Sequence, residues 1–337
     1  MLQFLVKRLL IAVPTLLGVS ILAFSLIRMV PGDPVRLLLG ERGGDPKVYQ
    51  EMRSNLGLDR PIIEQYFLFI GGAVQGDLGK SIHSKQPVIK EFWARFPATV
   101  ELGVAGLFLA VILGIPMGIV AAVNRSKFPD YFLMGGALVG YSMPIFWWGL
   151  ILILFFSISL GITPVSGRLS VIYDVDPVTG FLLIDTWLSG AGPAAFFDAI
   201  AHLALPAMAL GTVPLAAIAR MTRSSLLEVL KEDYIRTAKA KGLLAYQVVT
   251  KHALRNALIP IVTIVGIMFG SILTGAILTE TIFSWPGIGK WLVQSVTSRD
   301  YPVIQGGVLL ISLMVILVNT FVDFLYHVIN PTLRDQL

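Results

Sequence analysis

The feature of this sequence that most constrains its fold is a series of apolar runs, each about 20 residues long, between segments that collect the charges. A helix of that length crosses the hydrocarbon core of a bilayer. Only 14% of the residues are charged while 55% are apolar, a balance that water-soluble proteins rarely show. We therefore predict an all-α membrane protein with six transmembrane helices, at Leu9–Ile27, Thr99–Val123, within Tyr131–Leu160, and at Ala199–Ala219, Leu258–Leu278 and Val303–Tyr326.

Proline and glycine inside these runs predict how the helices bend and pack. The third run is longer than a bilayer needs, so we expect a break in it at Pro144. Pro206 and Pro214 predict interruptions of the fourth run in the same way. Gly114 and Gly118 lie four residues apart, which gives their helix a flat face that a neighbouring helix can approach closely.

The Lys and Arg of the short loops predict the orientation of the chain. Both termini, residues 124–130 and residues 220–257 fall on one side of six consecutive spans, and their positive charges assign that side to the cytoplasm. Residues 29–98 then lie outside, and their turn signals and helical pattern predict a small subdomain. The predicted plan is residues 1–28 as the amino terminus and first span, the outer subdomain, and a core of residues 99–337.

The loop at residues 220–257 is the most strongly charged part of the chain. Its eight Lys or Arg outnumber Glu228, Glu232 and Asp233, so it carries a net +5, equal to the formal charge of the whole protein. Helical spacing predicts a short helix that ends at Gly242, because glycine tolerates the left-handed backbone that follows a helix end. A short helix with small side chains can enter a groove of another protein.

Segments of this loop resemble a known family. The run Thr237-Ala238-x3-Gly242, preceded by an acid, is similar to the cytoplasmic loop signature of ABC importer permeases. Residues 236–242 with 252–260 resemble the dipeptide and oligopeptide branch of that family. Arg255 stands where the broad family usually has proline, a departure that the peptide branch shares. The outer turns and the segment Glu280–Gly287 also resemble the B-type subunits of this branch.

The resemblance implies a permease subunit of a bacterial inner-membrane importer for dipeptides or short peptides, of the type I permease fold. In that family the loop is a coupling helix that docks on an ATP-hydrolysing subunit. The implied partners are a second similar permease, two ATPase subunits that carry ATP and Mg, a periplasmic binding protein and membrane lipid, with no nucleic acid. The coupling role is assigned to Glu232, Asp233, Tyr234, Arg236, Thr237, Ala238, Ala240, Lys241, Gly242 and Arg255.

The residues leave other interpretations open. A basic loop beside a membrane can simply be solvated, and Ala-x3-Gly also fits a helix-turn-helix DNA reader, although both flanks of this loop run straight into apolar spans. A stand-alone carrier needs a membrane-buried ionisable relay, for which Asp323 is the only candidate. Oligopeptide, glutathione, nickel-chelate and haem importers share much of the pattern, so the substrate also stays open.

The sequence lacks the usual features of a catalytic or metal site. It contains no G-x4-G-K-[ST] motif, so we expect no ATP hydrolysis by this chain, and its four histidines lack metal-ligand spacing. We therefore predict no catalytic residue, cofactor or metal. The enzymatic alternative is an intramembrane serine hydrolase, in which Ser142 would need a base such as His202 within hydrogen-bond reach.

Polar groups inside the spans are candidates for the transport pathway, because they are costly in lipid and normally face an interior. Asp323 lies near the inner end of the last span, where it is either a plain interfacial acid or the partner of Arg220 or Arg223 in an inner gate. Tyr141–Pro144 is a candidate hinge. The predicted pathway and gate residues are Tyr141, Ser142, Met143, Pro144, Thr274, Asn319, Asp323, Arg220 and Arg223.

Two outer loops, residues 161–198 and 280–302, are the predicted docking surfaces for a binding protein. The first gathers acids on a backbone rich in Pro and Gly, and the second places aromatic residues where they could wedge against a partner. The second segment is alternatively a re-entrant packing segment without partner contact. The predicted docking residues are Glu280, Phe283, Trp285, Asp174 and Asp176.

Overall fold

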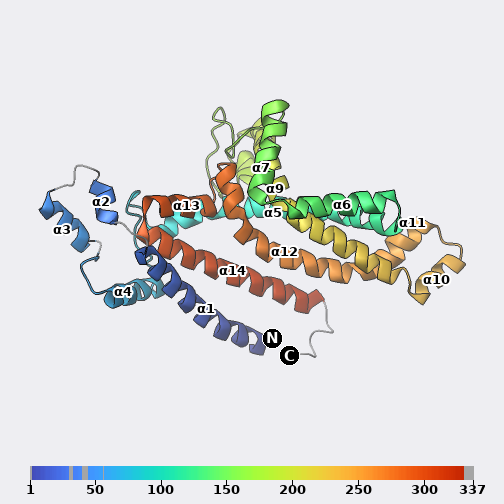
Figure 1. Cartoon of the computed structure of the whole chain (residues 1–337), viewed down its shortest axis with the longest axis horizontal. Helices are drawn as coiled ribbons and strands as arrows, with labels where there is room; N and C mark the ends of the chain where they lie inside the picture. The colour runs from blue at the N-terminus through green and yellow to red at the C-terminus, as the bar shows by residue number, and fades with distance from the viewer. Residues whose placement is uncertain (1, 30–32, 40–44, 56, 330–337) are drawn as a thin grey trace. The chain divides into compact units, whose positions relative to one another are not determined.

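The computed structural model describes residues 2–29, 33–39, 45–55 and 57–329. Figure 1 shows that these residues form helices joined by loops, with an antiparallel bridge between Lys80 and Pro87. The described residues fall into two compact units. One consists of residues from 1–96 and 287–320, and the other of residues from 97–286 and 321–337.

The first unit joins the predicted outer subdomain to elements from the other end of the chain. Leu78, Val88 and Phe92 share one apolar core with Trp291 and Val303. The predicted subdomain 29–98 is therefore completed by a helix that sequence reasoning placed in an outer loop, and by the start of the last span. The helices of this unit are α1 (Leu2–Met29), α2 (Pro34–Leu39), α3 (Pro46–Asn55), α4 (Ile62–Val74), the first part of α5 (Val88–Val123), α13 (Ile288–Ser298) and most of α14 (Tyr301–Ile329).

The second unit is built around α9 (Gly192–Val229), which packs on α6, α7, α8 and α12. In α9, 61% of the apolar window is buried, against 17–28% in the other long apolar helices, so α9 is the enclosed helix of this unit. Its other elements are the rest of α5, α6 (Phe128–Ser142), α7 (Ile145–Leu152), the π-helical turn η1 (Ile153–Ser159), α8 (Leu182–Leu188), α10 (Asp233–Ala240), α11 (Ala245–Gln247), the π-helical turn η2 (Val248–Ala253) and α12 (Leu254–Ile282).

Close packing of α5 on α9 follows from the glycines predicted to permit it. A Cβ atom at Gly118 would lie 2.5 Å from the side chain of Thr222 and 2.6 Å from the carbonyl oxygen of Ala219. A Cβ atom at Gly114 would lie 3.0 Å from the carbonyl oxygen of Leu215. The prediction of a close helix–helix contact at these two glycines is confirmed.

The number of candidate spans depends on one broken helix. Among the described residues, five helices are long and apolar enough to cross a membrane, and α6 with the α7–η1 helix makes a sixth if the pair counts as one span. The two parts of this pair are bent by 109° at Met143–Pro144, which confirms the predicted break. The predicted interruptions at Pro206 and Pro214 are wrong, because α9 is continuous through both. Both prolines are buried, and packing by neighbouring helices can hold a helix whose backbone has lost a hydrogen bond.

Candidate functional site

Helix α10 lies at one end of the second unit, where the chain passes from α9 toward α12 (Figure 1). Its inward face consists of Ile235 and Ala238, which are 0% and 6% exposed. These two side chains belong to an apolar cluster with Leu226 of α9, Val248 of η2 and residues of α12. The short helix is therefore seated on both long helices that flank it in sequence.

All the predicted coupling residues except Ala238 face outward. Ala238 packs inward, so it is not available for the direct contact with a partner that its small size suggested. Asp233 and Arg236 form an exposed ion pair of 3.2 Å, which adds little stability in water. The exposed coupling residues are Glu232, Asp233, Tyr234, Arg236, Thr237, Ala240, Lys241, Gly242 and Arg255.

The carboxyl end of α10 is fixed by its backbone. Gly242 has a φ of +78°, the left-handed conformation predicted for it. Its N–H donates to the carbonyl of Lys239, and the N–H of Leu243 donates to that of Ala238. This pair of bonds is the Schellman arrangement, which satisfies carbonyls left free at a helix end. The Tyr234 hydroxyl also accepts a hydrogen bond from Asn256 of α12 at 2.7 Å.

A buried ion pair near this end connects α6 to α9. Arg223 donates from Nε to Oδ1 of Asp130 at 2.6 Å and from Nη2 to Oδ2 at 2.7 Å. The Asp130 side chain is 4% exposed, and it also accepts the N–H of Ser126. Sequence reasoning named Arg223 but not Asp130, whose only signal was its place at the start of a helix after a basic loop.

The described contacts of Arg220 and Arg223 involve other residues than Asp323, and the inner gate stays a prediction. Arg223 pairs with Asp130, and the guanidinium of Arg220 lies 4.9 Å from the ring centroid of Tyr141. Neither contact is the one predicted with Asp323. Asp323 is half-buried and Asn319 is exposed, whereas the side chain of Thr274 lies outside the described part of the structure.

The bend between α6 and α7 brings the other pathway candidates to the surface of the second unit. Tyr141, Ser142 and Pro144 are exposed and Met143 is half-buried. A largely apolar cavity of about 630 Å³ is lined by Ser142, Met143, Pro144, Leu138, Val139, Phe146 and Trp147. Trp148 anchors the bend by donating to Thr212 of α9 at 3.0 Å.

The serine and histidine of the hydrolase alternative have other partners. The Ser142 hydroxyl donates to the carbonyl of Leu138 in its own helix at 2.9 Å. Nδ1 of His202 lies 2.9 Å from the carbonyl oxygen and 3.2 Å from a carboxylate oxygen of Asp198, one helical turn earlier. Described contacts therefore fix each residue locally, and none of them is the serine–histidine hydrogen bond that the alternative needs.

The predicted docking residues at the end of α12 and just after it are enclosed by the chain itself. Glu280 is 0% exposed, and Phe283 and Trp285 are 1% exposed. Glu280 accepts a hydrogen bond from the Thr99 hydroxyl at 2.5 Å, and the indole of Trp285 donates to the carbonyl of Ala98 at 2.8 Å. The expectation that these three side chains wedge against a partner is corrected, because their surfaces are used inside this chain.

A second largely buried ion pair holds the loop at residues 161–198 over α5. Arg168 donates from Nη2 to Oε2 of Glu101 at 2.5 Å and from Nε at 3.0 Å, and it lies over the ring of Trp285. Glu101 also accepts the N–H of Leu183 at 2.9 Å. The loop is thereby tied to α5, to α8 and to the buried segment after α12.

Three acids of the loop at residues 161–198 divide between surface and interior. Asp174 and Asp176 are exposed, as a docking role requires. Asp185 is 2% exposed and accepts bonds from the hydroxyl and N–H of Thr179 and from the N–H of Gly180. Burial alone would raise the pKa of the Asp185 carboxyl, but these hydrogen bonds outweigh it and hold the pKa below its ordinary value.

Within the described ranges, no group of three or more His, Cys, Asp or Glu side chains could hold a metal ion. The features present are instead several membrane-length helices, a bend at Pro144 and a short polar helix seated on two long ones. These features define a polytopic membrane protein that exposes a connection between helices.

Comparison with family models identifies the family of this membrane protein. Residues 114–335 match the model described as the inner membrane component of binding-protein-dependent transport systems, and residues 1–103 match the model of the N-terminal region of such components. The chain belongs to this family of inner-membrane transport components.

Curated relatives extend over the full chain. The di/tripeptide transport system permease protein DppB of Pseudomonas aeruginosa strain UCBPP-PA14 is 55% identical over 336 residues, covering 100% of both chains. The dipeptide transport system permease protein DppB of Escherichia coli K12 is 54% identical over 339 residues, again covering 100% of both. A solved amino acid ABC transporter chain aligns with a TM-score of 0.51 at 13% identity, covering 71% of this chain and 94% of that one, and it supports the permease fold.

Proposed function

We propose that this chain is the permease subunit of an ATP-binding cassette importer that carries dipeptides or other short peptides across a bacterial inner membrane into the cytoplasm. The peptide assignment is supported by two full-length relatives, more than half identical, that are named for di/tripeptide and dipeptide transport. A second permease subunit, two ATPase subunits that bind ATP and Mg, and an external peptide-binding protein complete the proposed transporter. Both termini and α10 lie on the cytoplasmic side in this proposal, which the Lys and Arg of the short loops support.

The geometry of α10 is the observation that carries the proposal. Its polar and basic face is exposed, while Ile235 and Ala238 pack on Leu226 of α9 and on residues of α12. A force applied to the exposed face by an ATPase subunit would therefore move α10 together with both long helices, instead of deforming a loop. Such rigid-body movement is an established way to switch between two states of access.

Three further assignments belong to the same proposal. Tyr141–Pro144, at the 109° bend, act as a hinge beside the pathway, to which Arg220, Thr274, Asn319 and Asp323 also contribute. Residues 29–98, together with α13 and the start of α14, form the periplasmic part. The binding protein docks on the loop that exposes Asp174 and Asp176.

The experiment that tests coupling reverses one charge on α10. In Arg236→Glu, we expect the amount of ATPase subunit that co-purifies with the chain to fall at least tenfold, because like charges across an interface cost several kcal/mol and each 1.4 kcal/mol is about a factor of ten. Peptide uptake should fall with it, while the amount of chain in the membrane stays unchanged. Lys47→Glu on α3 is the matched control, since it makes the same reversal at an exposed position of the first unit.

A result of normal ATPase binding and normal uptake in Arg236→Glu would contradict the proposed role of α10. The substrate is tested separately, by competition of unlabelled di- and tripeptides with labelled dipeptide uptake. Failure of both to compete would reject the peptide assignment and leave the coupling assignment standing.

A further inference from the structure

The first unit contains a cavity that none of the assignments above uses. It has a volume of about 210 Å³ and lies where the last turn of α1, the helix α4 and the first turns of α14 meet. Its polar lining comes from Arg28, Gln65, Tyr301 and Gln305, and its apolar lining from Leu58, Leu68, Phe69, Ile82 and Pro302.

The positive charge in this cavity has no carboxylate partner among the described residues. Arg28 is half-buried, and its described hydrogen bonds go to neutral oxygens. It donates to Oε1 of Gln65 from Nη2 at 2.7 Å and from Nε at 3.3 Å, and from Nη1 to the carbonyl of Phe24 at 3.2 Å. A guanidinium has five N–H donors, so these three bonds leave donors for a ligand. The Phe24 ring lies 3.4 Å from the guanidinium carbon and restricts its position.

The side-chain amide of Gln305, which also lines the cavity, has an unsatisfied hydrogen-bond donor. Gln305 is only 5% exposed, and within the described residues its Nε2 has no hydrogen-bond partner. A buried polar nitrogen without a partner costs about 1–3 kcal/mol. A ligand oxygen placed between Gln305 and Arg28 would remove that cost and would also receive the charge of the guanidinium. Arg28 and Gln305 together therefore suit an anion with several oxygen atoms.

The surroundings of the cavity suit hydrocarbon chains. Helix α4 has no buried residue although its sequence is strongly apolar, and it exposes Ile62, Ile63, Phe67 and Leu68 by 53–72%. The end of α1 exposes Leu26 and Met29 next to Arg28 in the same way. Arg28 and Tyr301 lie at the ends of two apolar spans, which is the depth of lipid headgroups.

We propose that this cavity binds the phosphate of an anionic phospholipid through Arg28 and the Nε2 amide of Gln305, with the acyl chains lying along the exposed apolar face of α4. Arg28 supplies charge and paired N–H donors, which suit phosphate oxygens. A lipid held there would cover apolar side chains of a short helix that is too short to span the membrane by itself.

The test measures lipid retention by the full-length chain, purified with its accompanying subunits, after detergent washing. Native mass spectrometry should show phosphatidylglycerol bound in preference to phosphatidylcholine. Gln305→Glu, which places a negative charge beside the phosphate, should lower bound phosphatidylglycerol about tenfold. Gln305→Met, which removes the donor at similar size, should lower it about fivefold. Gln50→Glu, at an exposed position of α3, is the control with the same charge change and should retain wild-type binding.

Equal phosphatidylglycerol retention by the wild-type chain and by both Gln305 variants would overturn the proposal. A second measurement separates the sources of phosphate. Phosphatidylglycerol vesicles should raise the thermal midpoint of the wild-type complex more than that of Gln305→Met. The same increase from inorganic phosphate alone would reject the lipid assignment in favour of a soluble anion, and displacement of the lipid by dipeptide would reject it in favour of a peptide carboxylate.

Discussion

The segment Glu280–Trp285 and helix α10 both connect long helices and both carry charged and aromatic residues, yet the chain encloses one and exposes the other. Glu280 and Trp285 use their polar atoms within the second unit, on Thr99 and on the carbonyl of Ala98. In α10, only Ile235 and Ala238 turn inward, and the polar side chains are exposed, including Tyr234, which accepts a hydrogen bond from Asn256. Residue type and the presence of an internal hydrogen bond therefore do not distinguish an enclosed segment from an exposed one, whereas the burial of the whole side chain does.

The largest expected effect lies in the enclosed segment. Trp285→Ala should destabilise the protein by about 3–5 kcal/mol, because it removes a buried indole and leaves a cavity. Trp285→Phe should cost less, since it keeps a ring and loses mainly the hydrogen bond to Ala98. Thermal unfolding of the purified complex measures both. Trp187→Ala, at a position 56% exposed, is the control and should change little. Equal effects at the two tryptophans would show that the segment is not enclosed.

A smaller effect is expected at the exposed helix. Gly242→Ala should cost about 1–2 kcal/mol locally, because a Cβ atom disfavours the left-handed backbone at φ +78°. The loss should weaken the end of α10 without unfolding the second unit, so uptake should fall more than the thermal midpoint. Gly190→Ala is the control, because it imposes the same kind of strain, at φ +75°, in the outer loop. A larger loss of uptake in Gly190→Ala than in Gly242→Ala would contradict the assignment of the coupling role to α10.

The smallest expected effect concerns pH and the outer loop. The pKa of Asp185 is lowered in the folded protein, so its ionised form stabilises the fold above the unfolded pKa, and this contribution is lost as pH falls through the folded pKa. The stability difference between wild type and Asp185→Asn should therefore shrink as pH falls from about 6 to about 3. Asp176→Asn, at an exposed position, should give a difference that is small throughout this range. A constant difference for Asp185→Asn would contradict the assigned pKa shift.

Local sequence signals account for much of the architecture. The apolar runs predicted the long helices, Pro144 predicted the break, and Gly242 predicted the end of α10, because length, proline and left-handed glycine act within a few residues. The closely packed face at Gly114 and Gly118 was predictable for the same reason.

Contacts between distant residues account for what sequence reasoning missed. Glu101 and Arg168 are 67 positions apart, and Asp130 and Arg223 are 93 positions apart. No periodic pattern in the sequence predicts either ion pair. Similarly, the burial of Glu280 depends on Thr99, which is 181 positions away. The continuity of α9 through Pro206 also depends on packing by neighbouring helices, and the helix propensity of a residue does not include such packing.

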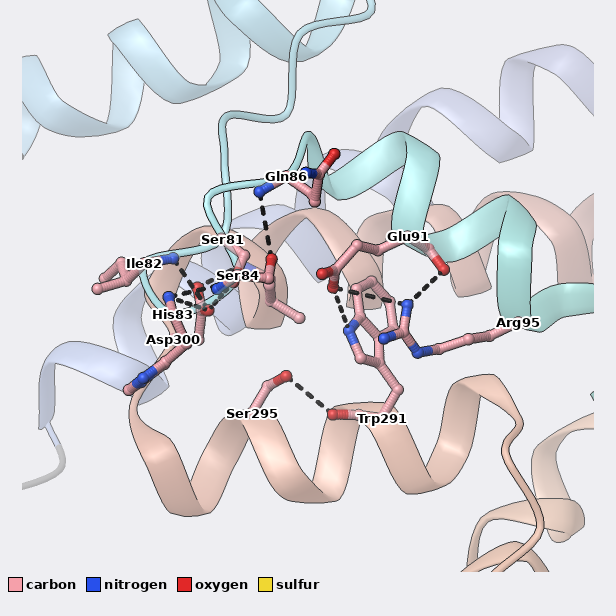
Figure 2. A network of polar contacts seen from close by, with 11 residues as sticks. Ser81, Ile82, His83, Ser84, Gln86, Glu91, Arg95, Trp291, Ser295 and Asp300 are labelled. Atoms are coloured by element: carbon pink, nitrogen blue, oxygen red, sulfur yellow. Dashed lines mark hydrogen bonds and ion pairs between the residues drawn. The ribbon is translucent and has the colours of Figure 1, made fainter. Parts of the chain in front are cut away.

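The close-up in Figure 2 shows a network of polar contacts that joins distant parts of the first unit. Asp300 accepts the Ser81 hydroxyl at 2.5 Å and the N–H of Ile82 at 3.0 Å, and Glu91 accepts the indole N–H of Trp291 at 2.7 Å. These bonds join the loop before α5 to Asp300, just after α13, and the first turn of α5 to the first turn of α13, in each case across 200 or more positions of the sequence. The first unit can complete this core only after most of the chain has been made.

The enclosure of α9 limits how this helix can move. It packs on α5, α6, α7, α8 and α12, and it continues into α10 after only Leu230, Lys231 and Glu232. Because a helix packed on most sides cannot shift alone without opening voids in a densely packed interior, any tilt begun at the α10 end of α9 has to be shared by its neighbours. A movement of the eight-residue helix α10 would therefore be passed on to most helices of the second unit.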